Sequence, residues 1–402
     1  MPPQATPGKT RRGIRDWRQC TTSRFLSLFP PDQLLAWSSA LALASPDQLT
    51  LNLPKGYLTY EPLAIFPSNS LPDGPGTLLS LLQGDQREIL WRIVLEELAR
   101  KSGMRLTHLA VNAGIPLQTE DAGSSENIMR RPTGLREVFG DFGAMEGGVQ
   151  CAFAEALWVW TRQNGIWQTW APKWTMFSRG NVVEKARLLD FHSSSPSPPN
   201  PSSSSTLSMR HIPATDLRHA VAVDMYAGIG YFVFSYARLG MRVFGWELNP
   251  WSVEGLRRGA LKNGWSVQVV QAHDTEIGDA QIVVFLEDNR NALRRLARLQ
   301  EQGKMEAGRV LHVNGGLLPS SEASWRDSWT VTRECEKAWL HLHDNVGVDD
   351  IEKRAVEIEA IFNKWAEEEG GQRRAKVEFT MKVKTFAPGV WHCVYDVYVY
   401  KI

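Results

Sequence analysis

Two glycines and an acidic residue follow a short apolar run in the second half of the chain. Residues 221–223 are apolar, Asp224 ends the run, and Gly228 and Gly230 follow it. Glycine lets the backbone come close to a ligand, and the apolar pattern of residues 231–239 predicts a helix with free N-terminal amides. The spacing therefore predicts a strand, a turn and a helix, with the turn able to hold a nucleotide-like ligand.

The turn does not complete the dinucleotide-binding fingerprint. That fingerprint needs a small residue three positions after the second glycine, and Val233 stands there. The pattern favours an adenosine ligand other than NAD. An ordinary strand-to-helix turn without a ligand remains the alternative, because glycine pairs after strands are common.

Polar residues also end two later apolar runs. Glu247 lies about twenty residues beyond the turn, where an acid can accept hydrogen bonds from both hydroxyls of a ribose. Asp288, Asn289 and Arg290 follow the apolar residues 282–286. The carboxylate and the amide could bind an adenine amine or face a reacting centre, and Arg290 could bind a carboxylate or phosphate. Alternatively, Asp288 and Asn289 only cap the next helix.

Strand and helix patterns alternate around these residues. Strands are expected at residues 221–225, 243–247, 267–271, 282–286 and 310–313. Such alternation predicts an α/β fold with a doubly wound, mainly parallel sheet. The tail departs from it with a strand at 339–344, a helix at 351–369, and strands at 376–384 and 392–399 that we expect antiparallel at an edge.

Composition limits the classes of partner and site. Lys and Arg number 45 against 44 Asp and Glu, so a polyanion must be met by a local patch. The four cysteines are far apart, and we expect no metal site and no disulfide framework. No apolar run of about 18 residues occurs and the N-terminus lacks a secretory pattern. We expect a soluble, cytoplasmic protein without a membrane segment.

The order of glycine turn, ribose acid and polar cluster is the arrangement of S-adenosylmethionine-dependent transferases. With the motifs at residues 224–232, 247–250, 288–290 and 176–185, the sequence resembles the tRNA wybutosine-synthesizing protein 2 family. That family consists of tRNA(Phe) 4-demethylwyosine aminocarboxypropyltransferases and is related to tRNA guanine-37 N1-methyltransferases. The resemblance spans about residues 50–402 and is dense from 175 onward.

The resemblance implies a class I, Rossmann-like S-adenosylmethionine-dependent transferase domain preceded by a smaller α+β domain. We expect a flexible basic tail at 1–20, an α+β region at 21–150, a hairpin and cofactor-contacting helix at 151–192, a Ser/Pro-rich linker or insertion at 193–210, and the catalytic domain at 211–402. The expected enzyme is a monomer that acts on tRNA(Phe).

The resemblance also implies site residues and a reaction. The cofactor contacts it implies are Ser178, Lys185, Glu247, Asp288 and Asn289, to which the turn adds Asp224, Gly228 and Gly230. The 3-amino-3-carboxypropyl arm would pass to the 4-demethylwyosine base at position 37 of tRNA(Phe), releasing methylthioadenosine. We expect Lys185 or Arg290 to pair with the methionine carboxylate, and Asp288 is a candidate general base.

The sequence leaves two alternatives to this reaction and offers four candidate tRNA contacts. The N1-methyltransferases carry Asn/Asp-Pro-Pro where Asp288-Asn289-Arg290 stands, which favours transfer of the arm over transfer of the methyl group. A non-catalytic tRNA-binding protein with a vestigial cofactor site is the second alternative. Arg130, Arg131, Arg179 and Arg290 are candidate tRNA contacts. Glu287 also differs from the small residue usual in the family before Asp288.

Overall fold

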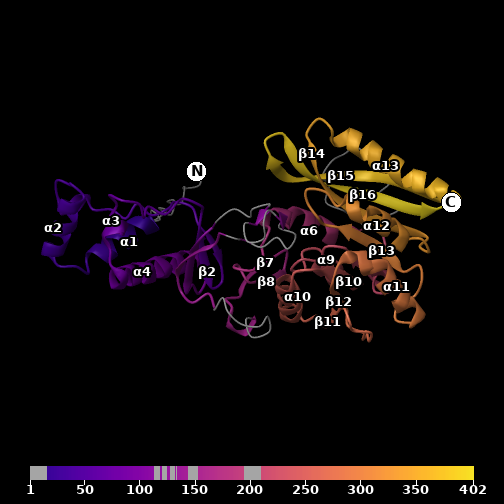
Figure 1. Ribbon diagram of the computed structural model, residues 1–402, viewed down its shortest axis with the longest axis horizontal. Coiled ribbons are helices and arrows are strands. Elements are labelled where there is room, and N and C mark those ends of the chain that lie inside the picture. The colour runs from indigo at the N-terminus through magenta and orange to yellow at the C-terminus, as the bar shows by residue number, and fades with distance from the viewer. Residues whose placement is uncertain are drawn as a thin grey trace, which may run out of the picture. The chain divides into compact units, whose positions relative to one another are not determined.

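The chain divides into two compact units. The computed structural model describes residues 16–112, 118–119, 125–126, 132, 134–143, 153–193 and 210–402. One unit comprises residues 1–126 and 132–159, and the other comprises 127–131 and 160–402 (Figure 1). Among the described residues, no helix is both long and apolar enough to cross a membrane.

The first unit is built on a four-stranded sheet in the order β1-β2-β3-β6, in which only β2 and β3 are parallel. Its strands are β1 (Leu58–Tyr60), β2 (Leu63–Phe66), β3 (His108–Val111) and β6 (Arg136–Phe139), and β4 (Gln118–Thr119) pairs separately with β5 (Ser125–Glu126). Its helices are α1 (Trp17–Leu26), α2 (Pro31–Ala40), α3 (Leu78–Leu81) and α4 (Gly84–Ser102).

Helix α1 begins within the segment that was expected to be a tail. Asp16 caps it by accepting a hydrogen bond from the amide of Arg18, and Trp17 and Phe25 are buried in the core of this unit. Burial of these two aromatic side chains gives residues 17–20 a reason to be ordered. A sequence reading dominated by the Pro- and Arg-rich residues before them does not reveal that packing.

The second unit contains an eight-stranded sheet in the order β11-β12-β10-β9-β13-β14-β16-β15. The strands are β9 (Val221–Asp224), β10 (Arg242–Glu247), β11 (Val267–Gln271), β12 (Ile282–Leu286), β13 (Val310–Gly315), β14 (Lys337–Gly347), β15 (Arg373–Ala387) and β16 (Val390–Lys401). The first six in that order are parallel, whereas β16 is antiparallel to both β14 and β15. The expected antiparallel pair at an edge is confirmed, with β15 outermost.

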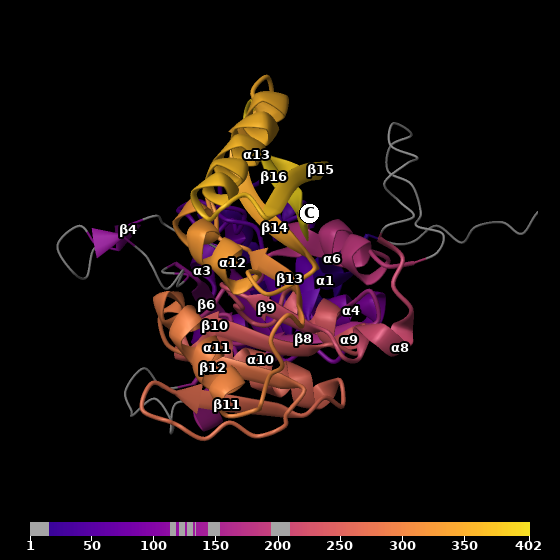
Figure 2. The same cartoon turned by 90° about the vertical axis from the view of Figure 1, so that its right-hand side faces the viewer.

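Helices cover both faces of this sheet (Figure 2). On one face pack α6 (Val182–Leu189), α8 (Ala214–Leu217), α9 (Val233–Arg238) and α10 (Pro250–Lys262). On the other pack α11 (Ala292–Glu301), α12 (Trp325–Val331) and α13 (Ile351–Glu368). Each face buries its own apolar cluster, which confirms the predicted doubly wound sheet.

A β-hairpin precedes the sheet in sequence. Strands β7 (Val159–Gln163) and β8 (Ile166–Trp170) are joined by Asn164 and Gly165, whose φ angles are +50° and +77°. Two residues with positive φ form the turn expected from an Asn-Gly pair. The hairpin lies within the segment 151–192 in which it was expected. The side chain of Asn263, at the end of α10, exchanges two hydrogen bonds with the Trp167 backbone and so fixes β8 against that helix.

Candidate active site

A cavity of about 350 Å³ lies in the second unit at the carboxyl ends of the central strands. The turn after β9, the end of β10 and the segment after β12 all contribute lining residues, as expected for a doubly wound sheet. Segments far away in the sequence complete the wall, and they supply Ser178, Asn181, Leu317, Lys384 and Phe386. The cavity therefore gathers residues from both sides of the Ser/Pro-rich segment.

Both glycines of the turn adopt conformations that other residues avoid. Gly228 has φ +54° and Gly230 has φ +90°. A Cβ atom at Gly230 would lie 2.5 Å from the ring of Phe234, and one at Gly228 would lie 2.9 Å from the ring of Tyr231. The turn therefore needs glycine for its backbone and for its packing. Gly228 lines the cavity, whereas Gly230 is not among the lining residues.

Glu247 ties the turn to the end of β10. Its carboxylate accepts hydrogen bonds from the backbone amides of Gly228, at 2.9 Å, and Asn249, at 2.8 Å. Burial raises the pKa of this carboxyl group, and the amide hydrogen bonds partly offset that effect. A carboxylate has acceptor capacity beyond two hydrogen bonds, and Glu247 lines the cavity. It can therefore accept further hydrogen bonds from a ligand.

Asp224 does not reach the cavity. Its side chain is fully buried, and one oxygen accepts hydrogen bonds from the Tyr226 amide and the Asn314 side chain, both at 3.1 Å. Burial raises its pKa to about 7. The structure thus places Asp224 beneath the turn, where it holds the backbone in shape, and not among the lining residues.

The cluster after β12 divides into lining residues and an exposed arginine. Asp288 and Asn289 line the cavity, and the Asn289 amide donates to the carbonyl of Met225 at 2.9 Å. Arg290 folds back on Asp288, with its Nη2 2.7 Å from a carboxylate oxygen, although its side chain is 85% exposed. This hydrogen bond lowers the pKa of Asp288. Asp288 therefore both caps the following turn and faces the cavity.

Glu287 has a partner that sequence reasoning missed. Arg295, one turn into α11, donates to both of its carboxylate oxygens at 2.9 Å, and both side chains are almost fully buried. Arg295 also donates to the backbone carbonyls of Gln271, Ala272 and Asp274. The departure at Glu287 is thus accommodated inside the fold by an arginine eight residues further on.

Ser178 lies at the cavity wall between a tyrosine and a lysine. Its amide donates to the hydroxyl of Tyr231 at 3.1 Å, and that hydroxyl donates to the carbonyl of Met176 at 2.7 Å. Its own hydroxyl accepts a hydrogen bond from the ammonium group of Lys384 at 3.2 Å. Lys384 was not among the predicted site residues. Lys384 lies outside the four motifs that carry the family resemblance, so the sequence did not single it out.

Lys185 lies behind this wall and is not among the lining residues. Its ammonium group donates to the side-chain carbonyls of Gln163 and Gln168, at 2.5 and 2.7 Å. It also lies 5.7 Å from the centre of the Tyr231 ring. Burial lowers the pKa of Lys185 to about 7. The structure therefore brings Ser178, Gly228, Glu247, Asp288 and Asn289 together at the cavity and leaves Lys185 one layer away.

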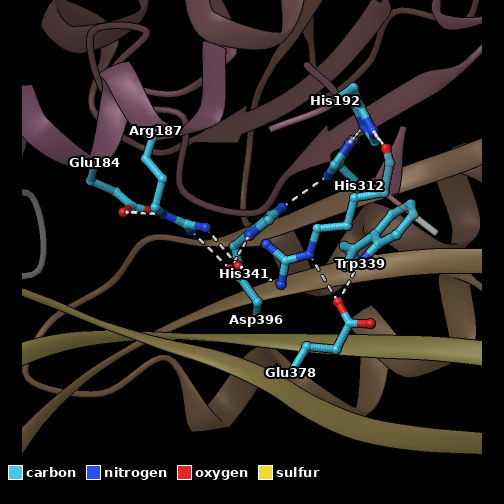
Figure 3. A network of polar contacts seen from close by, with 9 residues as sticks. Glu184, Arg187, His192, His312, Trp339, His341, Glu378 and Asp396 are labelled. Carbon is cyan, nitrogen blue, oxygen red and sulfur yellow. Dashed lines mark hydrogen bonds and ion pairs between the residues drawn. The ribbon is translucent and has the colours of Figure 1, made fainter. Parts of the chain in front are cut away.

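The helix that carries Lys185 is fixed to the sheet by a buried ion-pair network (Figure 3). Arg187 on α6 makes four hydrogen bonds of 2.6 to 2.9 Å, two to Glu184 on its own helix and two to Asp396 on β16. Both carboxylates are fully buried. This network holds the start of α6, and with it the segment of Ser178, against the sheet.

Three histidines extend the network from Asp396 to the backbone of Arg210 (Figure 3). His341 contacts Asp396 at 2.8 Å, His312 contacts His341 at 2.9 Å, and His192 contacts His312 at 2.8 Å. The far nitrogen of His192 meets the Arg210 carbonyl, which can only accept. These four contacts need four hydrogens, one more than three neutral imidazoles carry.

The extra hydrogen fits best on His341, which faces the carboxylate. Burial lowers the pKa of His192 to about 4 and that of His312 well below its usual range, so these two rings are neutral. With both ring nitrogens of His341 protonated, every contact in the chain has one donor and one acceptor. Two largely buried arginines, Arg187 and Arg210, lie among the three buried acids Glu184, Glu378 and Asp396.

Of the remaining predicted residues, only Arg179 lies within the described parts of the chain. Arg179 is exposed and is not a lining residue. Arg130 and Arg131 lie outside the described residues. Within the described parts of the chain, no group of three or more His, Cys, Asp or Glu side chains could hold a metal ion.

Comparison with known proteins identifies relatives over most of the chain, although no family model matches it. The protein named tRNA wybutosine-synthesizing protein 2 of Schizosaccharomyces pombe is 37% identical over 353 residues, covering 86% of this chain and 72% of the relative. The protein of the same name from Saccharomyces cerevisiae is 34% identical over 316 residues, covering 73% of this chain and 60% of the relative. Among solved structures, Pyrococcus horikoshii TYW2 in complex with MeSAdo aligns over 92% of this chain and all of that one, with a TM-score of 0.52 and 16% identity.

The sheet is doubly wound, and the glycine turn, the acid Glu247 and the polar cluster after β12 surround one cavity. This combination defines a Rossmann-like transferase. The P. horikoshii structure shares this fold. The identity and coverage of the yeast relatives place the chain more narrowly, and it belongs to the tRNA wybutosine-synthesizing protein 2 family.

Proposed function

We propose that this enzyme transfers the 3-amino-3-carboxypropyl group of S-adenosylmethionine to the 4-demethylwyosine base at position 37 of tRNA(Phe). The observation that carries the proposal is the joint presence of Ser178, Gly228, Glu247, Asp288 and Asn289 around one cavity in a member of this family. These residues include four of the five implied by family resemblance as cofactor contacts.

The cavity suits a ligand with both donors and acceptors. Two lining residues, Asn181 and Trp246, each carry a buried polar atom without a hydrogen-bond partner in the described structure, an oxygen and a ring N–H respectively. Leaving such atoms unpaired costs free energy, so a ligand that pairs with them gains affinity. Glu247 adds free acceptor capacity. The nucleoside part of S-adenosylmethionine offers ribose hydroxyls, an adenine amine and ring nitrogens.

Different lining residues bind the two ends of that nucleoside. Glu247 accepts hydrogen bonds from the ribose hydroxyls, while Asp288 and Asn289 bind the adenine edge. Because Arg290 lowers the pKa of Asp288, that carboxylate is a weak proton acceptor near neutral pH. We therefore assign Asp288 to binding and not to general-base catalysis.

S-adenosylmethionine, when bound, supplies a sulfonium whose bond to the arm carbon breaks with the electron pair left on sulfur, giving methylthioadenosine. The acceptor atom of the base gains the arm and loses one proton. Since a neutral thioether leaves, the enzyme needs no acid to protonate the leaving group. The task of the protein is then to orient the arm toward the base and the methyl group away from it.

The proposal includes the substrate tRNA(Phe), a monomeric enzyme and a cytoplasmic setting. Within the described parts of the chain, the free thiols of Cys20, Cys335 and Cys393 fit a reducing compartment. Incubation of the purified chain with S-adenosylmethionine and tRNA(Phe) carrying 4-demethylwyosine tests the reaction. Mass spectrometry should find the arm on the base and an equal amount of methylthioadenosine. Release of S-adenosylhomocysteine instead would favour the N1-methyltransferase reading, and binding without any product would favour a vestigial site.

A further inference from the structure

One cation lines the cavity without an acidic partner. Among the described lining residues, Lys384 is the single lysine or arginine, and no ion pair to it occurs within the described parts of the chain. The three acids of the same lining are already engaged, Glu247 by backbone amides, Glu287 by Arg295 and Asp288 by Arg290. The positive charge at this wall is therefore available to a ligand.

The ammonium group is held in place from two sides. Lys384 stands on the edge strand β15 opposite His392 of β16, next to a bulge that shifts the register. Its side chain lies over Gly180, where a Cβ atom would come within 2.4 Å of its Cδ and 2.9 Å of its Nζ. Its Nζ reaches the hydroxyl of Ser178 at 3.2 Å. Absence of a side chain at Gly180 thus creates the space that the lysine occupies.

The other cations near the site are less suited to a ligand inside the cavity. Lys185 is separated from it by the lining and is bound to two glutamine side chains. Arg290 is paired with Asp288 and mostly exposed. Partial burial lowers the pKa of Lys384, because no fixed negative charge offsets the loss of water. An anion bound there would supply the missing partner.

We propose that Lys384 binds the carboxylate of the 3-amino-3-carboxypropyl arm and thereby sets which carbon of the sulfonium faces the acceptor base. This inference rests on the proposed function. Glu247 and the Asp288-Asn289 pair hold the nucleoside end, and Lys384 lies at the wall formed with Ser178. Holding both ends of one molecule fixes the direction of the arm between them. Lys384 is thus a specificity-determining residue that makes the contact expected from the sequence for Lys185 or Arg290.

Binding of two ligands that differ only in the arm tests the proposal. Isothermal titration of the full chain with S-adenosylmethionine and with methylthioadenosine, which lacks the arm, would be compared for wild type and Lys384→Gln. Loss of a charge-assisted hydrogen bond should weaken S-adenosylmethionine roughly 10- to 100-fold. Methylthioadenosine should change less than about twofold. Lys384→Arg should recover part of the affinity, because it keeps the charge.

Lys382→Gln is the matched control, since Lys382 is exposed on the same strand and does not line the cavity. It should bind both ligands as wild type does. Equal weakening of both ligands in Lys384→Gln would mean that the lysine only shapes the Ser178 segment, and unchanged binding of both would mean that it contacts no part of the cofactor. A loss confined to tRNA affinity would assign it to a phosphate. Each of these results overturns the inference while leaving the proposed reaction intact, whereas a wild-type chain that binds neither ligand overturns the proposed function itself.

Discussion

Removal of Arg187 should destabilise both the sheet of the second unit and the segment of Ser178. In Arg187→Met the four hydrogen bonds to Glu184 and Asp396 disappear, and both carboxylates are fully buried. Taking one partner from a buried pair costs about 3–5 kcal/mol. That is a large share of the roughly 5–15 kcal/mol that stabilises a folded domain. Glu184 loses both of its hydrogen bonds to Arg187, whereas Asp396 keeps its contacts to His341 and Arg210.

Hydrogen exchange can measure this loss of stability in peptides of the second unit, separately from the first unit. Peptides from β14 and β16 should exchange on the order of 10²- to 10⁴-fold faster in Arg187→Met, if their slowest amides report unfolding of this unit. Arg179→Met is the matched control, since Arg179 is exposed eight residues earlier in the chain, and it should exchange as wild type does.

The same experiment contains a test of the cause. Adding Glu184→Gln to Arg187→Met removes the buried carboxylate that has lost its hydrogen bonds, so the double variant should exchange more slowly than the single one. If Arg187→Met exchanges at the wild-type rate, the network contributes little to stability. If the double variant exchanges faster than the single one, the cost does not come from buried charge.

Two further predictions concern pH and the nucleoside. Burial lowers the pKa of His192 and of His392 to about 4, so the unfolded chain binds more protons than the folded one below pH 6.5, and stability should fall as the pH drops from 6.5 toward 4. Asp224, with its pKa raised to about 7, acts in the opposite direction over part of this range. The urea midpoint should be lower at pH 5 than at pH 7, with a smaller difference in His392→Asn, and an equal or higher midpoint at pH 5 would contradict the assignment of neutral buried imidazoles. Glu247→Gln should weaken S-adenosylmethionine and methylthioadenosine by a similar factor of roughly tenfold, because both carry the ribose; a loss for S-adenosylmethionine alone, seen by titration calorimetry, would place Glu247 at the arm instead.

Local features of the sequence were enough to predict the turn and the acid that line the cavity. The strand, the turn with Gly228 and Gly230 and the following helix are neighbours in the chain, so their arrangement depends on short-range geometry. Glu247 was predictable because one strand–helix–strand unit has a nearly constant length. Helix α9 nevertheless begins at Val233, later than the apolar pattern suggested.

The contacts that could not be predicted join residues that are distant in the sequence. Lys384 reaches Ser178 across 206 residues, and it does so only because β15 folds back beside the segment before α6. For Lys185 and Arg290 the sequence revealed a charge but not its partner, which proves to be a pair of glutamines in one case and Asp288 in the other. Charges were thus visible in the sequence, whereas their availability to a ligand depended on tertiary contacts.

The central claim is that the arm of S-adenosylmethionine, and not its methyl group, reaches the tRNA base. S-adenosylmethionine labelled separately in the methyl carbon and in the carboxypropyl carbons can be supplied with tRNA(Phe) from cells that lack this activity. The account predicts that only the carboxypropyl label enters the tRNA and that the methyl label leaves as methylthioadenosine. Methyl label alone in the tRNA would contradict it.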